Sequence, residues 1–175
     1  MSLGVLGLLV YENDRIRKRD KRLLYLTYLL IAASALAEFC GVALDGKETF
    51  PRSVLLIVKC MDYILTPMAG GALILQMHLK NRWNSVMMGL LALNTVLQLI
   101  SSAIGGWMAA IDARNHYTHG PLYPLYMGLC LAIILIVIAQ FIIYGRSFRR
   151  QNRASLYATM LLVVIGIAIQ ELSDA

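Results

Sequence analysis

Long apolar segments alternate with short polar ones along almost all of the 175 residues. A membrane-spanning helix needs about 20 mostly apolar residues, and the segments do not alternate with the period of two that is typical of barrel strands. Because only helices and closed barrels satisfy their backbone inside lipid, the pattern predicts an all-α membrane protein. Five full transmembrane helices are expected, at about 23–44, 53–79, 84–111, 122–145 and 154–172.

A shorter apolar segment, Ser2–Tyr11, has only ten residues and is too short to span. It differs from a signal peptide because its basic cluster follows the apolar stretch instead of preceding it. We interpret it as a truncated N-terminal half-helix. Residues 1–175 are therefore expected to form a single transmembrane domain that is cut at both ends.

The composition agrees with this assignment. Hydrophobic residues make up 59% of the chain and charged residues 15%, against roughly 25% charged residues in soluble domains. These values exclude a water-soluble globular domain and a disordered chain. The net charge of +6 does not indicate nucleic-acid binding, because the basic residues lie between apolar segments and form no patch on a soluble surface.

The basic residues predict the orientation. The expected loops 12–22, 80–83 and 146–153 hold 12 of the 16 Lys and Arg residues, whereas the alternate loops 45–52 and 112–121 hold three. Loops rich in Lys and Arg remain on the cytoplasmic side. The loops 45–52 and 112–121 are therefore predicted to face outward.

Three ionisable residues lie inside the apolar segments at a similar depth. At a rise of 1.5 Å per residue, Glu38, Lys59 and Asp62 are roughly 9–14 Å below the outer interface. Lys59 and Asp62 share a helix face, so Lys59 is expected within ion-pair distance of Asp62 or Glu38. Two interpretations remain open: an internal ion pair that locks two helices, or the floor of an outward-facing ligand pocket or ion site.

Other polar residues fall in the same outer half of the predicted helices. Tyrosines at this depth also serve as interface anchors, and buried amides also link helices. The candidate ligand-binding residues that join Glu38, Lys59 and Asp62 are Ser101, Ser102, Tyr123, Tyr126 and Gln170.

Two glycine-containing sites interrupt the predicted helices. Pro67 followed by Gly70 and Gly71 predicts either a kink that acts as a hinge or close helix packing. Gly105 and Gly106 are interpreted in the same way. The three cysteines form no Cys-x-x-Cys motif, and His116 and His119 alone are too few for a metal site. We expect no catalytic residues, no metal and no cofactor, and the chain itself is not predicted to be an enzyme.

Several segments resemble the multi-helix membrane sensory region that precedes diguanylate cyclase (GGDEF) or kinase domains in bacterial receptors. Besides Glu38, the segments that carry the resemblance are LDGK (Leu44–Lys47), YILTPMAGGALILQ (Tyr63–Gln76), AAIDARNHYTHGPLYPLY (Ala109–Tyr126), RRQNRASLY (Arg149–Tyr157) and GIAIQEL (Gly166–Leu172). The resemblance implies about seven helices in the bacterial cytoplasmic membrane and an output domain in the cytoplasm.

This resemblance leads to the expected function: a sensory domain that binds a small molecule among the outer halves of its helices and controls a cytoplasmic output domain. A small-solute-binding subunit of a transporter and a structural membrane protein without a ligand remain alternatives. The expected partners are the lipid bilayer, an unidentified small molecule and, as an open alternative, a second copy of the chain; nucleic acid is not expected.

Overall fold

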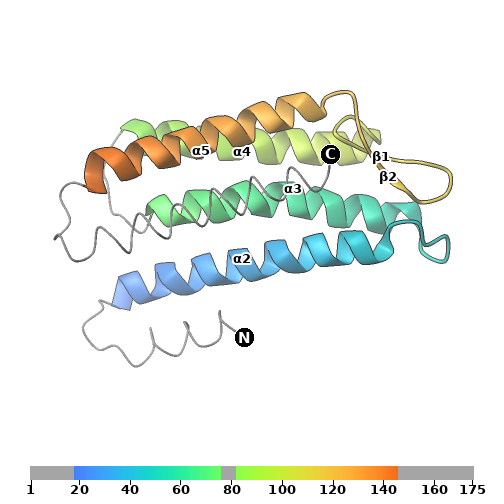
Figure 1. Ribbon diagram of the computed structural model, residues 1–175, viewed down its shortest axis with the longest axis horizontal. Helices are drawn as coiled ribbons and strands as arrows, with labels where there is room; N and C mark the ends of the chain where they lie inside the picture. Colours follow the sequence, from blue (N-terminus) through green and yellow to red (C-terminus); the bar gives the residue numbers. More distant parts are fainter. Residues whose placement is uncertain (1–17, 76–81, 146–175) are drawn as a thin grey trace. The chain divides into compact units, whose positions relative to one another are not determined.

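The computed structural model describes residues 18–75 and 82–145, which form four long helices and a short β-hairpin (Figure 1). The helices are α2 (Lys18–Leu44), α3 (Arg52–Leu75), α4 (Arg82–Ile104) and α5 (Tyr123–Gly145), and the strands are β1 (Ala109–Ile111) and β2 (Tyr117–His119). Each of these four helices contains a stretch long and apolar enough to cross a membrane. The predicted helical fold is confirmed for this part of the chain, and the four helices suggest a membrane protein.

Three of the predicted helices agree with the structure over the described residues: 23–44 with α2, 53–79 with α3 and 122–145 with α5. The predicted helix 154–172, the half-helix Ser2–Tyr11 and the candidate residue Gln170 lie outside the described residues.

The predicted helix 84–111 is wrong at its carboxyl end. Helix α4 ends at Ile104, because Gly105 and Gly106 adopt φ angles of 84° and 107°, a region that L-residues with side chains rarely occupy. Both glycine amides donate hydrogen bonds to the carbonyl of Ser101, which completes the last turn. The glycine pair therefore ends the helix, and the chain continues into a hairpin that makes the fold not purely helical.

The hairpin connects α4 to α5. Strands β1 and β2 are antiparallel, with Ala109 opposite His119 and Ile111 opposite Tyr117. The chain divides into two compact units, residues 1–134 and 135–175. The site described below lies wholly in the first unit, which includes the hairpin and the first half of α5.

Helix α3 packs on both α2 and α4, and its first half also contacts β1. Gly71 of α3 faces Leu91 of α4 so closely that a Cβ at position 71 would lie 2.6 Å from Leu91 Cδ1. This supports close packing as a role for Gly71, while Pro67 lies buried inside α3.

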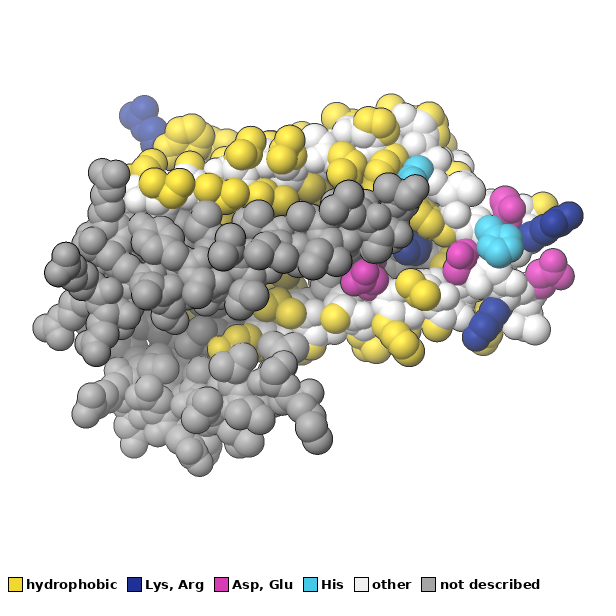
Figure 2. All heavy atoms as spheres, viewed as in Figure 1, with side chains coloured by type: hydrophobic (Ala, Val, Ile, Leu, Met, Phe, Trp, Pro, Cys, Tyr) yellow, Lys and Arg dark blue, Asp and Glu magenta, His cyan; other side chains and the backbone are white. Residues whose placement is uncertain are grey.

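The surface of the four helices is rich in exposed apolar side chains, as expected for lipid-facing helices. Figure 2 shows these side chains along the helices, whereas the acidic and histidine side chains that it colours lie toward one end, together with several basic ones. That end contains the loop after α2 and the hairpin.

Candidate functional site beneath a hydrogen-bonded cap

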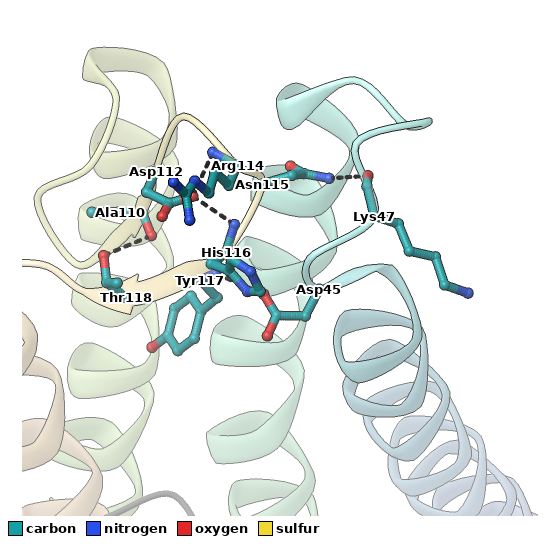
Figure 3. A network of polar contacts seen from close by, with 9 residues as sticks. All are labelled: Asp45, Lys47, Ala110, Asp112, Arg114, Asn115, His116, Tyr117 and Thr118. Carbon is teal, nitrogen blue, oxygen red and sulfur yellow. Dashed lines mark hydrogen bonds and ion pairs between the residues drawn. The ribbon is translucent and has the colours of Figure 1, made fainter.

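Two segments distant in sequence are joined at this end of the molecule, and we call them together the cap: residues 45–51 and residues 105–122 (Figure 3). The backbone amide of Gly46 donates to the carbonyl of Asn115, and the Asn115 side-chain amide donates to the carbonyl of Lys47 at 2.7 Å. The backbone amide of Tyr117 donates to Asp45 Oδ1 at 2.7 Å. The loops 45–52 and 112–121, predicted to share one side of the membrane, therefore lie in contact.

Asn115 holds the centre of the cap. Only 2% of its surface is exposed, and its φ angle is 62°, a left-handed conformation that Asn tolerates better than most residues. This backbone conformation allows its carbonyl and its side-chain amide to reach the loop after α2 at the same time.

Asp112 organises the turn of the hairpin. Its Oδ1 accepts hydrogen bonds of 2.8 Å from the backbone amides of Arg114 and His116. The hydrogen bond from the His116 amide is the main cause that lowers the pKa of the exposed Asp112 carboxyl below its ordinary value. Desolvation opposes this shift, and the hydrogen bond from the Arg114 amide adds to it.

The two histidines of the hairpin have separate surroundings. His116 Nδ1 lies 3.8 Å from Asp45 Oδ1, and its ring covers Gly46, where a Cβ would be 2.6 Å from the imidazole. His119 lies instead against Tyr123, with ring centroids 3.8 Å apart. Among the described residues, no group of three or more potential ligands could hold a metal ion.

Where the cap meets the helices, four tyrosines and His119 form what we call the tyrosine cluster: Tyr63 of α3, Tyr117 and His119 of β2 in the cap, and Tyr123 and Tyr126 of α5. The rings of Tyr63 and Tyr126 are stacked at 4.4 Å, and Tyr63 meets Tyr117 edge-on. The hydroxyls of Tyr63 and Tyr117 are hydrogen-bonded to each other. Tyr63 and Tyr126 are buried with Met108 and Ala109, so the cluster joins the hairpin to the helices.

Lys59 is half-buried and reaches this cluster from α3. Its Nζ lies over the Tyr117 ring, 4.6 Å from the centroid, a cation–π arrangement. The predicted ion pair is wrong: within the described residues, Lys59 pairs with neither Asp62 nor Glu38. Helical side chains lean toward the amino end of their helix, which turns Lys59 toward the cap.

Asp62 belongs to a different set of contacts. It is 5% exposed, and its Oδ1 accepts a hydrogen bond of 3.2 Å from Thr66, one turn further along α3. Thr66 is in turn hydrogen-bonded to Ser34 of α2 at 2.7 Å. Asp62 therefore takes part in linking α3 to α2, while Glu38 lies half-buried on α2.

Of the remaining candidates, Tyr123 and Tyr126 lie in the tyrosine cluster, whereas the two serines serve the backbone. Ser101 Oγ accepts a hydrogen bond of 2.9 Å from the amide of Met108 and so connects α4 to the hairpin. Ser102 Oγ donates to the carbonyl of Leu99 on its own helix.

Helix α4 adds two buried amides to the α3 side of the site. Asn94 donates from Nδ2 to the carbonyl of Tyr63 at 2.9 Å, and the Cys60 thiol donates to the carbonyl of Gln98 at 3.6 Å. Within the described part, Asn94 Oδ1 and Gln98 Nε2 are buried without a hydrogen-bond partner. Buried polar atoms of this kind are costly in a protein interior unless a ligand or water satisfies them.

The sequence interpretation missed three residues of the candidate site: Tyr63, Tyr117 and Asn115. Tyr63 follows Asp62 in an apolar segment and carried no distinct signal. The spacing of polar residues in 112–117 is that of a tight turn, but it does not reveal which distant loop the turn contacts. Comparison of the chain with protein-family models, curated proteins and solved structures finds no match.

Proposed function

We propose that this chain is the membrane-embedded input domain of a bacterial signalling receptor, which binds a small ligand at the tyrosine cluster and controls a cytoplasmic output domain such as a diguanylate cyclase. The observation that carries the proposal is the tyrosine cluster itself. It buries the rings of Tyr63 and Tyr126 at one end of apolar helices, next to the half-buried Lys59, and a cap above them joins two loops by hydrogen bonds.

The position of the cluster suits signal transmission. Its members come from α3, β2 and α5, so a ligand that separates or draws together two of these elements changes how α3 meets its neighbours. A ligand shifts a conformational equilibrium only through different contacts in the two states. The buried Asn94 Oδ1 and Gln98 Nε2 supply additional polar atoms on the adjacent face of α4.

A transporter subunit is the second candidate, because Pro67 interrupts the hydrogen bonding of a spanning helix. Transporter substrate sites are often formed by helices that are broken near the middle of the membrane. Both candidates require a ligand at the cluster, but only the transporter carries its solute across the bilayer.

The proposal is tested by measuring ligand-induced thermal stabilisation of the full chain in nanodiscs with a panel of amino acids, organic acids, amines and aromatic compounds. The test variant is Tyr126→Leu, and the matched control is Leu125→Met on the exposed side of the same helix turn. We expect at least one compound to raise the melting temperature of the wild type and the control but not of Tyr126→Leu. Uptake of that compound into proteoliposomes would favour the transporter, and stabilisation without uptake supports the input domain.

A further inference from the structure

Pro67 lies inside α3 and changes the backbone hydrogen bonding four residues earlier. Proline has no amide hydrogen, so the bond that residue 67 of a helix would otherwise donate to the carbonyl of Tyr63 cannot form. Helix α3 nevertheless continues to Leu75. Because Tyr63 is only 7% exposed, its carbonyl needs a hydrogen bond from some other donor.

That donor comes from the neighbouring helix. Asn94 of α4 is 1% exposed, and its Nδ2 donates to the carbonyl of Tyr63 at 2.9 Å. The carbonyl that receives this bond is the same one that Pro67 deprives of its helical donor. In helices that span membranes, proline is tolerated where a neighbouring helix satisfies the backbone groups that it frees.

A second bond joins the same two helices in the opposite direction, nearer to the cap. The Cys60 thiol of α3 donates to the carbonyl of Gln98 of α4 at 3.6 Å. Cys60 precedes Tyr63 by three residues, and Gln98 follows Asn94 by four, so the two bonds lie about one helical turn apart. Together they fix the position of α4 along α3 beside Tyr63.

Tyr63 connects this point to the tyrosine cluster. Its ring stacks on Tyr126 of α5 at 4.4 Å and meets Tyr117 of β2 edge-on, while its backbone carbonyl is bonded to Asn94. A helical turn that lacks one of its own backbone hydrogen bonds is easier to bend. Without the bond from Asn94, the backbone of Tyr63 and the ring attached to it would therefore be less well fixed.

We propose that Asn94 is a positioning residue, which supplies the hydrogen bond that Pro67 removes and thereby holds the Tyr63 ring in the tyrosine cluster. The regulatory meaning of this contact rests on the proposed input function, because a movement of α4 along α3 would then act directly on the ligand site. The role of Asn94 itself is tested without a ligand, so its failure would leave the proposed function standing, and the reverse also holds.

The first experiment compares the melting temperatures of the full chain in nanodiscs for the wild type, Asn94→Leu, Pro67→Ala and the double variant. Leu is similar in size to Asn but has no donor. In the wild-type background, Asn94→Leu leaves the carbonyl of Tyr63 without this donor, and we expect the melting temperature to fall by about 5 °C or more. In the Pro67→Ala background the amide of residue 67 replaces the donor, so the same change should cost about half as much or less.

Thr95→Val is the matched control at the next position of α4. The Thr95 hydroxyl donates to the carbonyl of Leu91 in the same helix at 2.9 Å, so its loss should lower the melting temperature equally in both backgrounds. Equal losses for Asn94→Leu in the two backgrounds would overturn the inference. If Asn94→Leu folds only together with Pro67→Ala, the expected result is obtained in its strongest form, whereas failure to fold in both backgrounds also overturns the inference.

A second measurement observes the carbonyl itself. Tyr63–Ile64 is the only Tyr-Ile pair in the sequence, so labelling with ¹³C-carbonyl tyrosine and ¹⁵N-isoleucine selects this one carbonyl in solid-state NMR of the same nanodiscs. A carbonyl ¹³C nucleus resonates at a lower chemical shift when its hydrogen bond is lost. We expect Asn94→Leu to lower the shift in the wild-type background and to lower it less in the Pro67→Ala background. An unchanged Tyr63 resonance in Asn94→Leu would overturn the inference.

Discussion

The cap and the helices beneath it are held together by different interactions. In the cap, backbone groups and short polar side chains join residues as far as 72 positions apart in the sequence. Between the helices, contacts are largely apolar and are supplemented by single polar links such as Ser34–Thr66 and Asn94–Tyr63. The arrangement of the cap therefore depends on the directions of its hydrogen bonds, whereas the helix contacts depend on how well apolar side chains fit together.

This difference has a consequence for tolerance to substitution. A hydrogen-bonded turn whose backbone is in contact with other backbone cannot move aside, whereas an apolar helix contact can adjust by rotating a side chain. Changes of equal size should therefore be more damaging in the cap than between the helices.

The largest effect is expected for Gly120→Ala in the cap. A Cβ at position 120 would lie 2.3 Å from the carbonyl oxygen of Trp107 and 2.5 Å from that of Gly106, so the backbone of the hairpin would have to move. We expect a loss of about 3 kcal/mol or more in stability, measured as a lower melting temperature in detergent. Gly128→Ala on α5 is the control, because a Cβ there meets no atom within 4 Å; equal losses in the two variants would contradict the comparison.

Asn115→Ala is expected to cause the second-largest loss of stability. It removes the hydrogen bond to the carbonyl of Lys47 and places Ala at a φ angle of 62°. The expected loss is roughly 2–3 kcal/mol, from the lost hydrogen bond between the two loops and from backbone strain. Asn115→Gly relieves the strain and should recover about 1 kcal/mol of it. Thermal melting that ranks Asn115→Ala no lower than the exposed Arg114→Ala would show that the link between the loops adds no stability.

Between the helices, Gly71→Ala should have a smaller effect. The added Cβ would meet the end of the flexible Leu91 side chain at 2.6 Å, and Leu91 can turn away. We expect a loss of about 1 kcal/mol, visible in the melting temperature. Gly70→Ala, with no atom within 4 Å, should be close to neutral. A loss at Gly71 as large as that at Gly120 would mean that the helix contact is as rigid as the cap.

The smallest effect concerns pH and Asp112. Because the backbone amide of His116 lowers the folded-state pKa of Asp112, this group adds stability above the unfolded pKa of about 3.9. That contribution is lost as the pH falls through the unfolded value toward the lowered folded one. Melting curves between about pH 5 and pH 3 should therefore show a decline in the wild type that is shallower in Asp112→Asn. Identical slopes would show that Asp112 does not contribute to the stability of the hairpin.

The sequence was informative where one physical rule dominates. Apolar length predicted α2, α3 and α5, and the distribution of basic residues grouped the loops 45–52 and 112–121, which the structure places in contact. The prediction from apolar length failed at Gly105–Gly106, where the sequence remains apolar although the backbone conformation ends the helix.

The candidate site was predictable only in part. The predicted depth of Lys59, Tyr123 and Tyr126 placed all three at one end of the molecule. In the structure Tyr123 and Tyr126 contact each other, and Lys59 lies on Tyr117 of the same cluster. Spacing on a helix suggested an ion pair of Lys59 with Asp62, but side-chain direction separates them, because Lys59 extends toward Tyr117 and Asp62 accepts from Thr66. The contact between Asn115 and Lys47 depends on tertiary geometry, which residue spacing does not contain.

The central claim is that the cap is the outward, receiving end of the domain. It is tested most directly by labelling single cysteines in intact cells with a membrane-impermeant maleimide, in a background where Cys40, Cys60 and Cys130 are replaced by Ala. A cysteine at the exposed Thr118 should react in intact cells, and one at Gln151, in the predicted cytoplasmic loop 146–153, only after permeabilisation. Labelling of Gln151→Cys in intact cells with protection of Thr118→Cys would contradict the account.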